Sequence, residues 1–169
     1  VISGNSAGNN GGGIYISYPG TFTMENGTIS GNSADKNGGG VYVHNSGAFT
    51  MNSGSISGNS ATQNGGGVYA ENIGTAFTVK DGTIGGSTAA DANTAKYGGG
   101  VYVKNSTFTM SGGKVTGNSA TKDGGGVRLD KGTFHMSGSA VISRNTTDTY
   151  GGGVDVNNGS FTMSGGSIN

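Results

Sequence analysis

Apolar and polar residues alternate in short segments that recur along the whole chain. One such segment follows three consecutive glycines at residues 38–43, which read Gly-Gly-Gly-Val-Tyr-Val. The same pattern returns at residues 11–16, 65–70, 98–103, 124–129 and 151–156. A segment of the type Phe-Thr-Met follows each of these, and a third segment is centred on a residue such as Ile56. The alternation predicts β-strands with one buried face, and no apolar spacing of three or four residues indicates a helix.

The spacing of these segments is nearly constant. The triple glycines begin at residues 11, 38, 65, 98, 124 and 151, at intervals of 27, 27, 33, 26 and 27 residues. Three short strands cannot enclose a core within one unit, but they can if each strand pairs in parallel with its copy in the next unit. The sequence therefore predicts an all-β fold, a right-handed parallel β-helix with three short strands per coil of about 27 residues and about six coils. The handedness follows from the usual chirality of parallel crossovers.

The inward positions of the strands predict a stacked core. In one coil they are Val41, Val43, Phe49, Met51 and Ile56, which we expect to stack on Val68, Phe77, Val79 and Ile84. In the sixth copy of the third segment, Val141 and Ile142 are adjacent apolar residues, so the pattern does not decide which of the two points inward. One corner is expected to carry an Asn ladder that hydrogen-bonds between coils. Its members are Asn5, Asn32, Asn59, Asn118 and Asn145.

Residues 1–169 are predicted to form a single β-helix segment. The chain begins and ends in mid-repeat, which we interpret as a fragment of a longer array. The copy that contains Ile84 has no Asn at the ladder position and carries an irregular loop at residues 87–97. This loop is the sole irregularity of the predicted solenoid, and loops on a regular scaffold are where function tends to lie.

Composition excludes several classes of partner. The formal net charge is zero, which gives no field to attract nucleic acid or an anionic membrane. No run of 18 apolar residues is present, so no membrane insertion of this segment is expected. The chain has no cysteine, which excludes disulfides and thiolate metal sites. His44 and His135 lie in different columns without further ligands, so we expect neither a metal site nor a cofactor.

The repeat resembles that of right-handed β-helix surface proteins of bacteria. The residues that carry the resemblance are Ile-Ser-Gly-Asn-Ser-Ala at 56–61 followed by Gly-Gly-Gly-Val-Tyr at 65–69. The polymorphic outer-membrane proteins of chlamydiae have a similar pair, Gly-Gly-Ala-Ile and Phe-x-x-Asn. The Gly/Ser/Thr/Asn-rich repeats of large surface proteins from gut Firmicutes and treponemes are also similar. The resemblance covers the whole chain and implies a stalk or an adhesin passenger outside the cell.

One outward column of the predicted solenoid is aromatic. Its members Tyr15, Tyr42, Tyr69 and Tyr102 occupy the polar position of the first strand and are our candidate ligand-binding residues. An exposed aromatic stripe would suit sugar rings or a packed partner. The alternative, which we favour, is that the rings stack across strands and only stabilise the sheet. Arg128 and Asp155 continue the column and are expected to pair.

Two further outward columns carry candidate chemistry. Glu71, Lys104 and Asp130 alternate in charge, which predicts a surface salt-bridge ladder. The alternative is a carboxylate pair of Glu71 and Asp130 in a carbohydrate-active enzyme, at the separation of an inverting glycosidase. Thr23, Thr50, Thr78, Thr109 and Thr162 form a Thr column interrupted by His135. A Thr column is similar to the surface of ice-binding solenoids, although those usually have two such columns.

From these patterns we expect a structural and interaction segment of a bacterial cell-surface protein, extracellular and without enzymatic activity. A glycan or a host surface protein is the expected partner. Unpaired strands at the two ends predict end-to-end self-association. The alternatives are a carbohydrate-active β-helix enzyme and a solenoid with a glycan-binding or ice-binding face.

Overall fold

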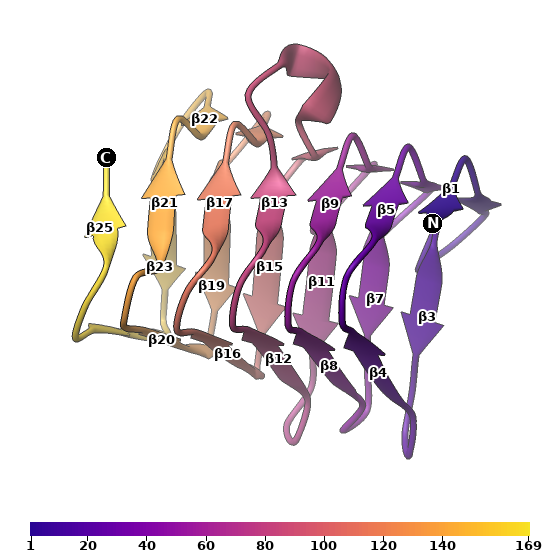
Figure 1. The fold of residues 1–169 in the computed structure, drawn as a ribbon, viewed down its shortest axis with the longest axis horizontal. Helices are drawn as coiled ribbons and strands as arrows, with labels where there is room; N and C mark the ends of the chain where they lie inside the picture. Colours follow the sequence, from indigo (N-terminus) through magenta and orange to yellow (C-terminus); the bar gives the residue numbers. More distant parts are fainter.

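The computed structural model describes residues 1–169 as a right-handed parallel β-helix, which confirms the predicted fold. The chain makes about six turns of roughly 27 residues, and each turn adds strands to the same parallel sheets. In Figure 1 the coils lie side by side, with the N-terminus and the C-terminus at opposite ends of the molecule. Equivalent residues of successive turns therefore form columns along the axis.

Two sheets arise from the first two predicted segments. Sheet 1 contains β3 (Ile14–Ile16), β7 (Val41–Val43), β11 (Val68–Glu71), β15 (Val101–Lys104), β19 (Val127–Asp130) and β23 (Val154–Asn157). Sheet 2 contains β4 (Thr21–Met24), β8 (Ala48–Met51), β12 (Ala76–Val79), β16 (Thr107–Met110), β20 (Thr133–Met136) and β24 (Ser160–Met163). The register is as expected, because Val41, Val68 and Val101 are direct partners.

The third predicted segment forms sheet 3, and a short fourth strand completes each coil. Sheet 3 contains β1 (Ile2–Ser3), β5 (Thr28–Ser30), β9 (Ser55–Ser57), β13 (Thr83–Gly85), β17 (Lys114–Thr116), β21 (Val141–Ser143) and β25 (Ser167–Ile168). Sheet 4 contains β2 (Ser6–Ala7), β6 (Ser33–Ala34), β10 (Ser60–Ala61), β14 (Thr94–Ala95), β18 (Ser119–Ala120) and β22 (Thr146–Thr147). Two residues are too few to show alternation, so the sequence did not indicate sheet 4.

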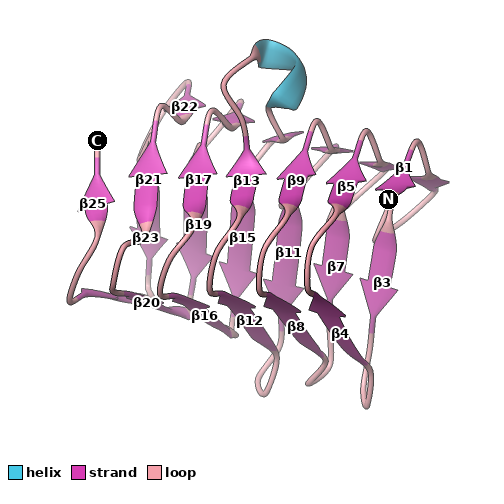
Figure 2. Cartoon of the chain, in the orientation of Figure 1, coloured by secondary structure: helices cyan, strands magenta, loops and turns pink.

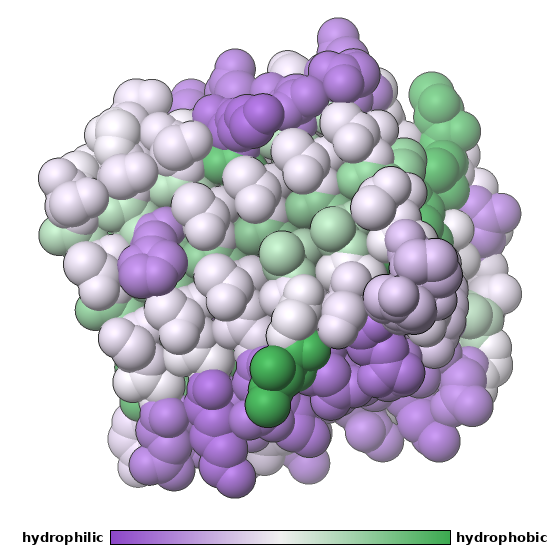
Figure 3. Space-filling view, turned by 90° about the horizontal axis from the view of Figure 1, so that it is seen from below, coloured by the Kyte–Doolittle hydropathy of each residue, from purple (hydrophilic) through white to green (hydrophobic).

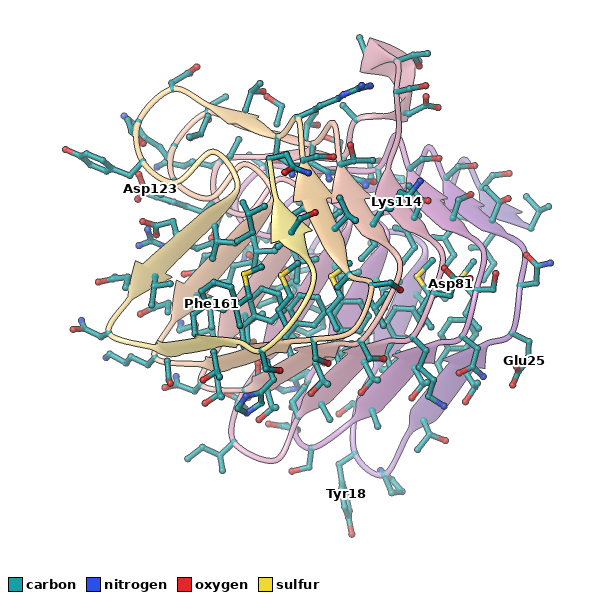
Figure 4. The ribbon with its side chains drawn as sticks, turned by 60° about the vertical axis from the view of Figure 1, so that its left-hand side comes forward. Tyr18, Glu25, Asp81, Lys114, Asp123 and Phe161 are labelled. Atoms are coloured by element: carbon teal, nitrogen blue, oxygen red, sulfur yellow. The ribbon has the colours of Figure 1, made fainter.

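The inward side chains form continuous apolar stacks. The ring centroids of Phe49 and Phe77 are 5.0 Å apart, close to the ~4.8 Å spacing of paired strands. Phe161 points into the coil at the C-terminal end, whereas Tyr18 points away from it (Figure 4). In the sixth copy Ile142 is the inward residue, because it is fully buried. One contiguous core therefore runs the length of the solenoid.

The triple glycines are required at the corner between sheets 4 and 1. Gly38 has a φ of +64°, a conformation that residues with a side chain rarely adopt. A Cβ atom on Gly39 would lie 2.4 Å from the carbonyl oxygen of Ser60 in the next coil. The corner therefore needs glycine both for its backbone conformation and for the close approach of successive coils.

The predicted Asn ladder is confirmed and has no gap. Oδ1 of Asn59 accepts hydrogen bonds from the backbone N–H of Asn32 at 3.0 Å and from its side-chain amide at 2.9 Å. In the fourth coil, where the sequence indicated that the Asn was missing, Asn93 accepts the same two bonds from Asn59. The sequence-based expectation was wrong here because the Asn follows the insertion instead of preceding it.

The irregular segment is consequently shorter than the predicted range of 87–97. Strand β14 already belongs to sheet 4, and Tyr97 pairs with the preceding coil through an isolated bridge to Asn64. The part that projects from the solenoid is residues 86–92, here called the corner loop, which contains the short 3-10 helix η1 (Ala89–Asp91). It is the only helical element in Figure 2.

Candidate functional site

The four tyrosines form the predicted column on the outer side of sheet 1. The rings of Tyr15 and Tyr42 have centroids 5.1 Å apart, and those of Tyr42 and Tyr69 are 5.3 Å apart. Tyr102 follows at 5.1 Å from Tyr69. The rings stack across strands, as the favoured interpretation predicts, and the alternative of an exposed stripe does not hold for three of the four rings. Tyr42, Tyr69 and Tyr102 are only 3%, 2% and 8% exposed, whereas Tyr15 is 52% exposed.

Neighbouring columns on both sides cover these rings. Tyr97 packs against the buried tyrosines from the side of the triple-glycine corner. The corner lies close to the ring column, since a Cβ atom on Gly38 would be 2.8 Å from Cβ of Tyr42. On the other side His44 stacks on Tyr42 with centroids 5.6 Å apart. A ligand that approached the column would therefore meet only the face of Tyr15.

The tyrosine hydroxyls converge on carboxylates of the next column. Glu71 accepts hydrogen bonds from Tyr42 and, at 2.8 Å, from Tyr69. The pKa values of the Tyr42 and Tyr69 phenols are raised above the usual value. Burial is the largest cause, and the neighbouring Glu71 carboxylate is the second. Burial and the nearby Asp130 raise the pKa of Tyr102 to about 12. These phenols stay protonated at neutral pH and act as hydrogen-bond donors that tie the two columns together.

The predicted salt-bridge ladder does not form. Lys104 lies between Glu71 and Asp130 in register, but no ion pair within 4 Å joins it to either residue. Glu71 faces Nε2 of His44 at 3.9 Å, and Asp130 accepts a hydrogen bond from Tyr102 at 3.4 Å. Neither carboxylate lines a groove. The alternative catalytic pair therefore lacks a cleft in which a sugar chain would lie.

Arg128 pairs with Asp155, as predicted from their shared column. It also pairs with Asp123 at 2.9 Å, a contact that the repeat pattern did not reveal. Asp123 lies across the triple-glycine corner from Arg128, where the chain folds back toward sheet 1. It also accepts a hydrogen bond from Thr149 at 2.5 Å. This cluster is an ion-pair network at the C-terminal end of the tyrosine column.

The two grooves of the molecule lie beside the corner loop. One, of about 570 Å³, extends over sheet 3 and includes Lys114 and Ser143 in its lining. The other, of about 390 Å³, extends over sheet 4 and includes Thr88 and Thr146. Figure 4 shows Lys114 on the outer side of β17, near the base of the corner loop. The sequence indicated this region only through the 33-residue interval between two triple glycines. That interval predicts an irregular loop but not the grooves beside it.

Sheet 2 presents a regular outer surface without charged residues. The predicted Thr column is in register, with His135 between Thr109 and Thr162. A second outward column of small residues runs beside it. Its members are Thr21, Ala48, Ala76, Thr107, Thr133 and Ser160. Figure 3, a view from below, shows this side as rows of mainly pale residues bordered by hydrophilic ones.

The structure contains no helix with the length and apolar character needed to cross a membrane. It also contains no group of three His, Asp or Glu side chains placed to hold a metal ion. Comparison with curated proteins and with solved structures gives no match. Comparison with protein families gives a match to the model described as the right handed beta helix region, over residues 1–136. This match covers most of the chain and agrees with the observed coil, so the protein belongs to the right-handed β-helix family.

Proposed function

We propose that the chain is a structural and interaction segment of a bacterial cell-surface protein, acting as a stalk or adhesin passenger outside the cell. The observation that carries this proposal is the continuity of the four sheets, since every coil is hydrogen-bonded to the next without a hinge. Such a solenoid holds its ends at a fixed separation, which is the physical requirement for a spacer. The resemblance of residues 56–69 to bacterial surface repeats supports the location.

Antibody labelling tests the proposal. Antibodies raised against the folded chain should bind intact cells of the source bacterium, and mild external proteolysis should remove the signal. An antibody against a cytoplasmic protein serves as the control for cell integrity. Labelling that appears only after the cells are lysed would contradict the extracellular location. A glycan or a host surface protein is the partner we propose for this segment, and the proposal includes no catalytic step.

The carbohydrate-active enzyme has less support than the structural role. The carboxylates of Glu71 and Asp130 are engaged by tyrosine hydroxyls and lie outside the two grooves. Release of reducing sugars from pectin by the wild-type chain, lost in Glu71→Gln, would favour the enzyme instead. Absence of release in both proteins agrees with the structural role.

Ice binding by the outer side of sheet 2 is a second candidate function. The observation that favours it is the second column of small residues beside the Thr column. The sequence pattern had indicated only the Thr column. Hydroxyl and methyl groups at the ~4.8 Å strand repeat form an ordered, uncharged surface. The wild-type chain should then inhibit ice recrystallisation, and Thr78→Lys should abolish the effect. Ser57→Lys on sheet 3 is the matched control, and no inhibition by the wild-type chain would refute this function.

A further inference from the structure

One corner of the solenoid contains a residue that departs from the repeat. The residue after the third strand is glycine in other coils, where Gly31, Gly58 and Gly117 have φ values of +62°, +63° and +67°. After β21, the sixth strand of sheet 3, this position is Arg144, with a φ of +55°. A residue with a side chain is disfavoured in this left-handed region, so arginine at this position costs backbone strain that glycine avoids. The repeat thus departs from its pattern to place a guanidinium group here.

Arg144 lies where the two grooves meet. Both grooves are lined by Arg144 together with Gly86 and Ser87 from the base of the corner loop. Half of the remaining lining residues carry hydroxyl groups. These residues are Thr88, Thr94, Thr116, Ser119, Ser143 and Thr146. The insertion of the repeat and the substituted corner glycine at position 144 therefore bound one polar, branched groove.

The positive charges of this groove have no partner within the protein. Neither Arg144 nor Lys114 makes an ion pair within 4 Å, and no Asp or Glu side chain lines either groove. The acidic residue of the corner loop, Asp91, accepts hydrogen bonds from the hydroxyl and the backbone N–H of Thr88. Its carboxylate therefore stabilises the loop. Two cations remain free to meet an external anion.

We propose that the groove around Arg144 binds an acidic carbohydrate, a glycan that carries carboxylate or sulfate groups. The planar guanidinium group matches both anions, and the surrounding hydroxyls suit the hydroxyls of sugar rings. Volumes of about 390 and 570 Å³ fall within the usual range of ligand pockets. No aromatic ring lines the groove to stack a nucleobase, which disfavours single-stranded nucleic acid. The site does not depend on the cellular location proposed above.

Two variants test the site without disturbing the fold. Arg144→Gly restores the residue of the other coils and relieves the strained backbone. Deletion of residues 87–92 leaves Ile-Gly-Gly-Asn-Thr-Ala, which matches Ile-Ser-Gly-Asn-Ser-Ala at 56–61 and returns Asn93 to the regular position. Lys131→Gly is the matched control, because Lys131 is an exposed cation with a φ of +57° that lies outside both grooves.

Binding is measured by calorimetry with heparin as the sulfated probe, polygalacturonate as the carboxylated probe and dextran as the neutral probe. The wild-type chain should bind at least one acidic probe, more weakly at high salt, and should not bind dextran. Arg144→Gly and the loop deletion should each weaken binding about tenfold or more, while Lys131→Gly should bind like the wild-type chain. The two acidic probes distinguish sulfate from carboxylate recognition.

Three results would overturn the proposal. The first is equal weakening by Arg144→Gly and Lys131→Gly, which would indicate a general charge effect. The second is undiminished binding by the loop deletion, and the third is no binding of either acidic probe by the wild-type chain. Because both variants restore the repeat, melting curves at or above the wild-type temperature are expected and would exclude unfolding as the cause of lost binding.

Discussion

The side-chain amide of Asn59 donates a hydrogen bond of 2.9 Å to Oδ1 of Asn93, although 34 residues separate them. The next step of the ladder, from Asn93 to Asn118, spans only 25 residues. The corner loop therefore leaves the solenoid and returns so that an Asn again occupies the buried corner. The position in the ladder, and not the number of residues in the coil, is what the structure preserves.

Replacement of Asn93 by alanine should destabilise the protein strongly. The backbone N–H and the side-chain amide of Asn59 would both lose their buried acceptor. Each unsatisfied buried donor costs about 1–3 kcal/mol, so for two donors we expect a loss of about 2–6 kcal/mol in urea unfolding. Asn5→Ala is the control, since Asn5 is exposed at the end of the ladder and accepts no such bonds. Equal losses in the two variants would contradict a structural ladder.

Gly58→Ala should destabilise more than Gly31→Ala. The two glycines occupy the same corner with nearly the same φ, so both substitutions incur about 1–2 kcal/mol of backbone strain. A Cβ atom on Gly58 would additionally lie 2.7 Å from the carbonyl oxygen of Ala90 in the corner loop. Thermal unfolding of both variants, in the wild-type chain and in the loop deletion, checks this. The difference in stability loss between the two variants should disappear when the corner loop is deleted. If the difference persists, the loop is not its cause.

Val68→Asp should unfold the surrounding coils. Val68 is fully buried between its partners Val41 and Val101, so the substitution buries an unpaired carboxylate. We expect a loss of about 3 kcal/mol or more, measured by circular dichroism during denaturation. The control Thr162→Asp introduces the same charge on the exposed side of sheet 2. A melting curve unchanged by Val68→Asp would refute the inward assignment.

Alkaline pH should destabilise the fold through the buried tyrosines. Their pKa values are higher in the folded chain than the usual 10.0, so the folded state keeps protons that the unfolded state loses. The stability that the buried tyrosines contribute is therefore fully present below pH 10. For Tyr102 this contribution is lost as the pH rises through about 12, its pKa in the folded chain. Urea unfolding from neutral to strongly alkaline pH measures the slope. Tyr69→Phe should have a shallower slope, and an identical slope would exclude Tyr69 as a contributor.

Two copies of the segment of residues 1–169 should associate through the terminal coils of that segment. The last coil leaves Val156, Met163 and Ile168 more than 40% exposed, and its strands have unpaired backbone groups. A second copy can cover this end by adding its first coil to the four sheets. Sedimentation velocity should show larger species as the concentration rises, and Met163→Glu with Ile168→Lys should reduce them. A monomer at every concentration would contradict end-to-end self-association.

Much of the fold followed from the sequence because a solenoid converts a position in the repeat into a column along the axis. The stacks of Val41 with Val68, and of Phe49 with Phe77, were predictable from spacing alone. The pairing of Arg128 with Asp155 followed from the same argument. A periodic sequence carries this information directly, since identical units bury their apolar faces most completely by stacking in register.

The lateral contacts between columns were decided only by the tertiary structure. The sequence placed Tyr69 on the outer side of its strand, but the folding of the triple-glycine corner and the reach of Glu71 bury its ring. The return of Asn93 to the ladder and the grooves beside Arg144 likewise depend on the path of the corner loop. The repeat fixes which residues stack from coil to coil. Which neighbouring columns touch depends on the angles of the corners, and the periodicity contains no information about those angles.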